Sequence, residues 1–307
     1  MGFRAGPISW PQATVADRRG NIWIANCAAD SVTVYPDGRP EHAFETVIQP
    51  PTSGATKMKP FGLAIDDLGR AWVAGNRNST LGVVGPDGHL LAVVPSTNTA
   101  GETQLTRPMG VASDSQGNIW VSNSDYMDVP CPPEEPDWGS GENPSVALFR
   151  RQPGGPALSG TTFTGGGITI PWGNAVDGDD TLWVANFSFP FTLIPGSNDP
   201  IGPNRLSHFC GVDTAKCPPT KQTVGQAISP DGTGYVSEAL ARNTGVSIDP
   251  SGNVWLANNW SLRIDVLNPR GNSIAVLIGA AAPIQTPLIG PPESFDQRRH
   301  RWRRHRH

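Results

Sequence analysis

PMGVASDSQGNIWVSN, residues 108–123, decides the fold, because its pattern occurs five times along the 307-residue chain. In every copy an aspartate lies six residues before a tryptophan. Six residues before the aspartate comes a proline, or an asparagine in the last copy. The pairs are Asp17–Trp23, Asp66–Trp72, Asp114–Trp120, Asp177–Trp183 and Asp249–Trp255. The first three copies repeat about every 48 residues, which indicates one array of similar units rather than two unrelated domains.

Each copy predicts two short antiparallel strands joined by a tight turn. Apolar residues precede the aspartate, and a run such as Ile119-Trp120-Val121 follows the turn. The aspartate side chain can accept hydrogen bonds from the turn backbone, while a glycine supplies positive φ. These glycines are Gly20, Gly69, Gly117 and Gly252. The fourth copy has Asp179-Asp180 instead, so we expect a less regular turn there.

Two further strands follow in most copies, around turns such as Pro36-Asp37-Gly38. The segments expected to pair in this way include 81–84 with 90–94, and 262–267 with 273–278 as third and fourth strands. The sequence therefore predicts an all-β chain, a β-propeller with five visible repeat motifs and five or six blades of four antiparallel strands. The repeated tryptophan is then a large apolar residue that packs one blade on the next, rather than a ligand contact.

The motifs at 108–123 and, with Asn for Pro, at 243–258 resemble the NHL-repeat β-propellers. This group borders on the gluconolactonase-like and virginiamycin B lyase-like propellers. The resemblance covers roughly residues 10–290 and implies one propeller domain over residues 1–292. If the motif near Met1 corresponds to the second blade of relatives, the domain lacks their first blade. Such propellers include hydrolases, lyases and binding scaffolds, so the resemblance implies a fold and no single activity.

Charge divides the chain into an acidic body and a basic end. The last ten residues hold six arginines and three histidines, so the remainder carries 17 basic against 27 acidic residues, a net charge of −10. Residues 293–307 are therefore expected to be a solvated, disordered basic tail. The body has no basic stripe, which argues against nucleic-acid binding by the propeller, and no stretch has the length of a membrane span.

Four cysteines bear on location. Cys210 and Cys217 lie close enough in sequence to close a small disulfide ring, with free thiols as the alternative. Cys27 and Cys131 form a second candidate pair across two loops. Disulfides and a charged fraction of only 16% favour an extracellular or periplasmic protein. The first ten residues lack a signal peptide, so a cytoplasmic location is the alternative.

Three long connections, residues 124–144, 153–170 and 210–242, are expected to leave the propeller on one face. Long loops on a rigid scaffold make that face the candidate site for a small molecule, a carbohydrate or a protein. The residues expected there are a ring at strand ends, Asn26, Asn76, Asn123, Asn186 and Asn258, flanked by Tyr126, Trp138, Tyr235, Glu238 and Trp260. The alternative is that each asparagine only bonds the backbone at its strand end.

The first long connection is rich in acid. Between Asp125 and Glu142 it holds six carboxylates, Asp125, Asp128, Glu134, Glu135, Asp137 and Glu142, and four prolines. Several oxygen ligands could hold calcium or another divalent metal, although the spacing differs from an EF-hand and the prolines favour a rigid solvated loop. No other cofactor is expected.

Signals for catalysis are sparse. The sequence contains no nucleophile elbow and no His-Glu-x-x-His motif, and His208 with Glu238 is the one base and acid pair that can be suggested. The favoured hypothesis is a scaffold that recognises a ligand or partner through long loops on one face. The alternative is a metal-assisted hydrolase or lyase acting on a lactone or cyclic ester.

Overall fold

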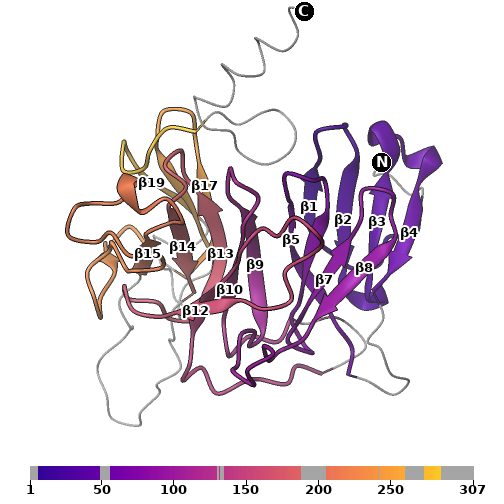
Figure 1. Cartoon of the computed structure of the whole chain (residues 1–307), viewed down its shortest axis with the longest axis horizontal. Coiled ribbons are helices and arrows are strands. Elements are labelled where there is room, and N and C mark those ends of the chain that lie inside the picture. The colour runs from indigo at the N-terminus through magenta and orange to yellow at the C-terminus, as the bar shows by residue number, and fades with distance from the viewer. Residues whose placement is uncertain are drawn as a thin grey trace, which may run out of the picture. The chain divides into compact units, whose positions relative to one another are not determined.

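The computed structural model describes residues 6–48, 56–129, 131, 135–187, 205–240, 242–259 and 273–284 (Figure 1). Strands make up nearly all of its regular structure, together with the single 3-10 turns η1 (Cys27–Ala29), η2 (Pro36–Gly38), η3 (Pro40–His42) and η4 (Thr214–Lys216). The strands form five antiparallel sheets, which confirms the all-β prediction. None of the helices in the described ranges is long and apolar enough to cross a membrane.

Four of the described sheets have four strands and the last has three, each in the order of the chain. The first contains β1 (Pro11–Ala16), β2 (Ile22–Asn26), β3 (Ser31–Tyr35) and β4 (Phe44–Val47); the second contains β5 (Pro60–Ile65), β6 (Ala71–Gly75), β7 (Thr80–Val84) and β8 (Leu90–Val94). The third contains β9 (Pro108–Ser113), β10 (Ile119–Asn123), β11 (Ser145–Phe149) and β12 (Thr161–Phe163). The fourth contains β13 (Pro171–Val176), β14 (Leu182–Asn186), β15 (Arg205–Phe209) and β16 (Tyr235–Val236), and the fifth contains β17 (Asn243–Ile248), β18 (Val254–Asn258) and β19 (Ser273–Leu277).

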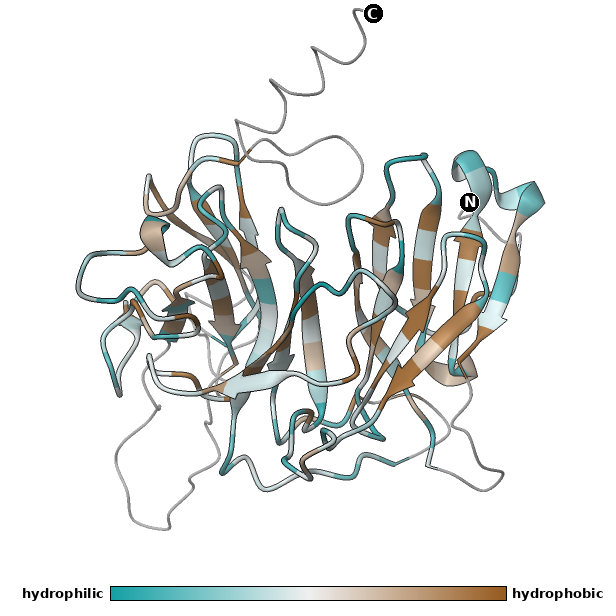
Figure 2. Cartoon of the chain, viewed as in Figure 1, coloured by the Kyte–Doolittle hydropathy of each residue, from teal (hydrophilic) through white to brown (hydrophobic). Residues whose placement is uncertain are grey.

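The chain divides into two compact units. Unit 1 holds the first three sheets except residues 145–146 of β11 and Phe163 of β12, and unit 2 holds these residues and the last two sheets. Within unit 1 the opening strand β5 contacts both β1 and β9, and within unit 2 β13 contacts β17. Sheets in each unit therefore pack through their first strands and bury the apolar face between them. Figure 2 shows the result, with hydrophobic residues along the strands and hydrophilic residues at the turns.

The repeated aspartate organises the turn between the first two strands. In the first copy Asp17 Oδ1 accepts hydrogen bonds from the backbone N–H of Arg19 and Asn21 at 2.8 and 2.9 Å. The N–H of Gly20 bonds the Asp17 carbonyl, and Gly20 has a φ of 86°, as a three-residue hairpin loop with a left-handed third residue requires. This bonding confirms the role that the sequence predicts for aspartate and glycine.

The spacing of six residues between aspartate and tryptophan has a cause that the sequence analysis missed. The second carboxylate oxygen accepts a hydrogen bond from the indole Nε1 in four copies, at 3.0 Å for Trp23, 2.8 Å for Trp72, 3.0 Å for Trp183 and 2.9 Å for Trp255. In the fifth sheet the bonds from Trp255 and from Asn253 lower the pKa of Asp249 to about 2. In these four copies the aspartate thus ties the turn to the following strand.

The fourth turn is regular, contrary to the expectation for Asp179-Asp180. Asp180 takes a φ of 58°, the value that glycine supplies in the other copies. Asp177 Oδ1 accepts the backbone N–H groups of Asp179 and Thr181 at 3.1 and 3.0 Å, as in the other copies. Aspartate is one of the few residues with a side chain that enters the left-handed region at low cost, so the turn survives without glycine.

The repeated tryptophans pack against the next sheet, as predicted, wherever that sheet lies in the same unit. Trp23 lies in the cluster of the second sheet, Trp72 in that of the third, and Trp183 in that of the fifth. All three are at most 2% exposed. Trp255 occupies the same motif position but is 42% exposed. Its neighbours on that face of β18 and β19 include Val276, directly opposite it, and Ile274.

The segment Ser273–Leu277 is a third strand, not the fourth strand expected from its sequence. It pairs along its length with β18, with Trp255 opposite Val276. The residue two positions past β19, Gly279, donates its N–H to Asn253 Oδ1 at 2.9 Å. The backbone N–H groups of Asp37 and Arg151, two positions past β3 and β11, each donate in the same way to the asparagine Oδ1 at the equivalent position of their own sheet's turn. The segment 262–267, expected as the third strand, lies outside the described residues.

Of the three long connections, residues 124–144 alone join the strands that the sequence predicts. Residues 124–144 join β10 to β11, at the strand ends opposite the Asp114 turn. The segments 153–170 and 210–242 each contain a fourth strand, β12 and β16, so much of each lies between a third and a fourth strand. Each added strand reverses the chain once more, which puts residues 210–234 at the end that carries the Asp177 turn. The prediction that all three insertions converge on one face was wrong.

Candidate functional site

Asparagines at the end of the second strand hold the chain that enters the same sheet. Oδ1 of Asn26, Asn123 and Asn186 accepts the backbone N–H of the residue seventeen positions earlier, at 3.2, 3.2 and 2.9 Å. The amide nitrogen of Asn258 donates to the Ala239 carbonyl at 2.8 Å. All four side chains are buried. This geometry matches the alternative in which each asparagine bonds the backbone at its strand end, and ligand binding by them stays a prediction.

The second sheet departs from this pattern by one residue. Gly75 pairs with Pro60 at the end of β6, where the other sheets have the asparagine, and Asn76 comes one position later. The shifted side chain serves the 124–144 connection instead. Asn76 donates from Nδ2 to the Met127 carbonyl at 2.9 Å, and its Oδ1 accepts the Val129 N–H at 2.8 Å. Asn76 is completely buried, so this is an interior anchor for the long loop.

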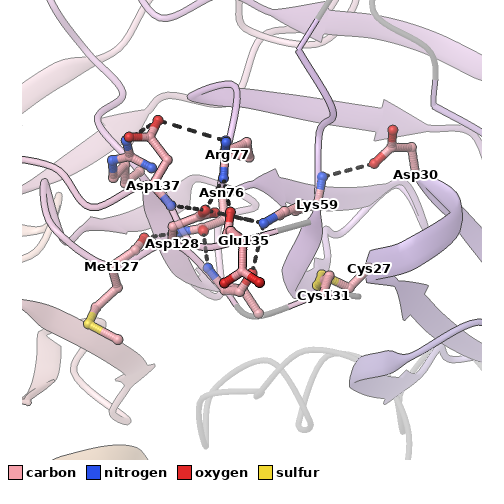
Figure 3. Close-up of polar contacts among 12 residues, drawn as sticks. Cys27, Asp30, Lys59, Asn76, Arg77, Met127, Asp128, Cys131, Glu135 and Asp137 are labelled. Carbon is pink, nitrogen blue, oxygen red and sulfur yellow. Dashed lines mark hydrogen bonds and ion pairs between the residues drawn. A yellow bond between two sulfur atoms is a disulfide. The ribbon is translucent and has the colours of Figure 1, made fainter. Parts of the chain in front are cut away.

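A buried ion pair fixes the same part of the loop (Figure 3). Lys59 Nζ lies 3.3 and 3.2 Å from the two carboxylate oxygens of Asp128 and 3.1 Å from the Val129 carbonyl. The side chains of Lys59 and Asp128 are 1% and 0% exposed. The backbone of Lys59 is fixed as well, because its N–H donates to Asp30 Oδ1 at 2.9 Å. A lysine this deeply buried requires its partner, since an unpaired charge in the interior is strongly unfavourable.

Two arginines continue the contacts toward the outer part of the loop. Arg77 donates from Nη1 to Asp128 Oδ2 and to the Glu135 carbonyl, the latter at 3.1 Å, and Arg107 Nη2 lies 3.2 Å from Asp137 Oδ2. The Asp137 N–H donates a hydrogen bond to Asp128 Oδ2 at 2.7 Å. Asp128 therefore accepts bonds from Lys59, from Arg77 and from the loop backbone (Figure 3).

Both candidate disulfides are present. Cys27, at the end of the first sheet's second strand, is bonded to Cys131 in the 124–144 loop, with 6.0 Å between the Cα atoms. The second bond joins Cys210 and Cys217, with Cα atoms 5.6 Å apart. The first disulfide attaches the long loop covalently to a strand end 104 residues away, beside the Lys59–Asp128 pair (Figure 3).

The outer part of the loop presents an aromatic pair. Tyr126 and Trp138 stack with ring centroids 5.5 Å apart and planes 20° apart. The Gly139 N–H donates to the Tyr126 carbonyl at 2.9 Å, which holds the two segments of the loop together. Trp138 is 48% exposed, in contrast to the buried tryptophans of the first four repeat motifs. Both residues were predicted for the site, and the structure brings them together.

The described carboxylates of the loop do not gather around one point. Asp128 is inside the buried ion pair, and Asp125 Oδ2 accepts hydrogen bonds from Ser140 and from the Asn143 N–H, both at 3.0 Å. Within the described ranges no three His, Cys, Asp or Glu side chains form a group able to hold a metal ion. Glu134 lies outside the described residues, and calcium binding stays a prediction.

His208 lies in the interior of unit 2. Its ring stacks on Trp183 at 3.8 Å between centroids, and its Nε2 is 2.6 Å from Thr181 Oγ1. Thr181 in turn donates to Asp177 Oδ2 at 2.8 Å. Burial lowers the pKa of His208 from 6.5 to about 4, while the charge of Asp177 acts in the opposite direction. The histidine therefore belongs to the packing around Trp183.

The suggested His208–Glu238 pair is not brought together. Val236 pairs with Arg205 at the start of β15, and the exposed Glu238 comes two residues after Val236. His208 lies three residues further along β15, opposite Trp183, which is about 10 Å in a strand. Tyr235 also packs near Trp183, with centroids 5.9 Å apart, and so lies on the sheet rather than at a loop tip. Trp260 lies outside the described residues.

The buried histidine predicts a pH-dependent stability. An unfolded chain takes up the proton near pH 6.5, whereas the folded chain does so only near pH 4, so stability falls as the pH is lowered through this window. The difference corresponds to roughly 3 kcal/mol. Urea unfolding of wild type and His208→Phe between pH 7 and pH 4 measures the free energy of unfolding at each pH. This free energy should fall less steeply with decreasing pH in the variant. His89→Gln, at a side chain that is 82% exposed, is the control and keeps the wild-type slope.

Known proteins resemble this chain in structure alone. No protein-family profile matches it, and no curated protein matches it in sequence. Among solved structures, a nidogen/laminin complex matches with a TM-score of 0.54 at 13% identity, over 89% of this chain and 78% of that chain. A gluconolactonase from Xanthomonas campestris matches with a TM-score of 0.51 at 16% identity, over 91% and 78%. A putative gluconolactonase gives 0.51 at 15%, over 91% and 81%.

These similarities and the five antiparallel sheets with a common turn motif define the class: the chain is a β-propeller. The sequence resemblance to NHL-repeat propellers, a group that borders on the gluconolactonase-like propellers, is confirmed at the level of fold. The extent of the domain, 1–292, stays a prediction, and the basic tail 293–307 lies outside the described residues.

Proposed function

We propose that this propeller is a recognition scaffold and that the loop of residues 124–144 is its contact surface. The observation that carries the proposal is the contrast within this loop between a fixed base and an exposed tip. Its base is held by the Lys59–Asp128 ion pair, by Asn76 and by the disulfide from Cys131. Its tip presents Trp138, 48% exposed and stacked on Tyr126.

A fixed loop of this kind is suited to binding because its conformational entropy is lost during folding rather than on association. Tryptophan and tyrosine are also the residues that contribute most to binding at protein surfaces, since each offers a large, rigid area with one polar atom. A propeller of similar fold occurs in a complex with laminin, which supports a scaffold role for such folds. The alternative function, a metal-assisted hydrolase or lyase, is supported only by the names of the gluconolactonase neighbours. At their low sequence identity these neighbours support a common fold and no common activity.

The test changes the tip and leaves the base intact, because deleting the whole loop would leave Lys59 without its partner. Wild type and the double variant Tyr126→Ala/Trp138→Ala are applied to an array of acidic, basic and neutral peptides and of neutral and acidic oligosaccharides. We expect binding to at least one class by wild type, weakened roughly tenfold or more in the variant. The unfolding midpoint is measured in parallel and should stay close to wild type. Equal binding by both proteins across the array would refute the proposal.

A further inference from the structure

We propose that the tip of the 124–144 loop binds a basic segment of a protein partner, with a lysine or arginine side chain seated at Trp138. This inference rests on the proposed function and names the chemistry of the partner. Its first support is the sign of the exposed charge. Residues 124–144 contain six carboxylates and no lysine, arginine or histidine.

The cations that neutralise part of this charge are shielded from solvent. The side chains of Lys59, Arg77 and Arg107 are 1%, 19% and 15% exposed, and they contact the loop from outside it. The carboxylates at the tip face solvent instead: the Asp137 side chain is 63% exposed, and Glu135 and Glu142 are exposed as well. A partner approaching this surface therefore meets negative charge, which attracts cations and repels anions.

The aromatic pair adds a site of matching chemistry. A tryptophan ring is the best side chain for a cation–π contact with an ammonium or guanidinium group. Trp138 is adjacent in sequence to Asp137, whose carboxylate is 63% exposed and already pairs with Arg107 at 3.2 Å and Arg77 at 3.9 Å, so a partner's cation at the ring would share this carboxylate with them. Tyr126 stacks on Trp138 and fixes the ring before the partner arrives.

A neutral sugar fits the same surface less well. Sugar hydroxyl groups need hydrogen-bond donors as well as acceptors, and an ionised carboxylate can only accept. The donors closest to Trp138 in sequence are already used within the loop. Ser140 Oγ donates to Asp125 Oδ2 at 3.0 Å, and the Gly139 N–H donates to the Tyr126 carbonyl at 2.9 Å. What remains exposed is the ring and the carboxylates, which together favour a cation.

The experiment titrates wild-type protein with a peptide of alternating lysine and glycine, its glutamate counterpart, and a neutral glucan oligosaccharide, by calorimetry at low and at raised salt. We expect the lysine peptide alone to bind, with an affinity that falls as salt rises. Trp138→Ala should weaken it roughly fivefold. Glu142→Gln should weaken it and reduce the salt dependence, whereas Glu41→Gln, at an exposed carboxylate of η3, should change neither.

Unchanged unfolding midpoints confirm that the variants are folded. No binding of the lysine peptide, or binding that Trp138→Ala leaves intact, overturns the inference. Binding of the oligosaccharide through Trp138 also overturns it but leaves the recognition role of the loop standing. The recognition role fails separately, when the Tyr126→Ala/Trp138→Ala variant binds every probe as wild type does.

Discussion

Trp183→Ala is expected to lower the free energy of unfolding by roughly 3–5 kcal/mol, the usual cost of removing a large aromatic side chain from a core. Trp183 is 2% exposed and lies in the cluster with Ile248 and Val254 of the fifth sheet. The change removes this packing, the stack on His208 and the hydrogen bond to Asp177 Oδ2 together. Urea unfolding at neutral pH, followed by circular dichroism, measures the loss.

The chain contains its own matched control for this variant. Trp255 has the same place in its motif and makes the same hydrogen bond, to Asp249 at 2.9 Å, but it is 42% exposed. Because it buries less area, Trp255→Ala should cost less than half as much as Trp183→Ala. Equal losses at the two sites would mean that packing against the next sheet is not what the repeated tryptophan provides.

Asp128→Ala on its own is expected to lower the free energy of unfolding by roughly 3–5 kcal/mol, because it leaves the Lys59 ammonium buried without a counter-ion. The same change releases Arg77 and the Asp137 N–H from their common acceptor. Thermal or urea unfolding measures the effect. Asp137→Asn is the control: the Asp137 side chain is 63% exposed, so its ion pairs with Arg77 and Arg107 are screened by water, and the change should cost about 1 kcal/mol or less.

A double variant separates the buried charge from the lost packing. Lys59→Met/Asp128→Leu replaces both charges by apolar side chains, and such replacements of buried pairs are often neutral or stabilising. We therefore expect it to recover most of the stability that Asp128→Ala loses. If the double variant is as unstable as Asp128→Ala, the loss comes from the shape of the site, and the buried lysine is not its cause.

Most of the fold could be predicted from local sequence motifs. The aspartate and glycine of each hairpin act within a few residues, so the turns at Asp17, Asp66, Asp114 and Asp249 could be predicted from spacing alone. The fourth turn could not, because Asp180 adopts the left-handed conformation that glycine usually takes. The exposure of Trp255 is likewise invisible in its motif, since it depends on what packs against that face.

The candidate site was predicted in part. The sequence pointed to the 124–144 loop, Tyr126 and Trp138 because a long acidic insertion with aromatic residues differs from the repeat around it. It gave no sign of Lys59, whose partner Asp128 is 69 residues away in an irregular segment. One signal was present: Asn76 stands sixteen residues after Pro60, whereas Asn26 and Asn123 stand fifteen after Pro11 and Pro108. That shift of one residue frees Asn76 to anchor the loop.

The central claim is that the scaffold holds the described parts of the 124–144 loop in one conformation, so that Tyr126 and Trp138 are ready to bind. Amide hydrogen exchange tests this most directly. The N–H groups of Val129, Asp137 and Gly139 donate to Asn76 Oδ1, Asp128 Oδ2 and the Tyr126 carbonyl. We predict that these amides exchange far more slowly than in an unstructured peptide and that Asp128→Ala speeds their exchange. Exchange at the rate of an unstructured peptide in the wild-type protein would contradict the claim.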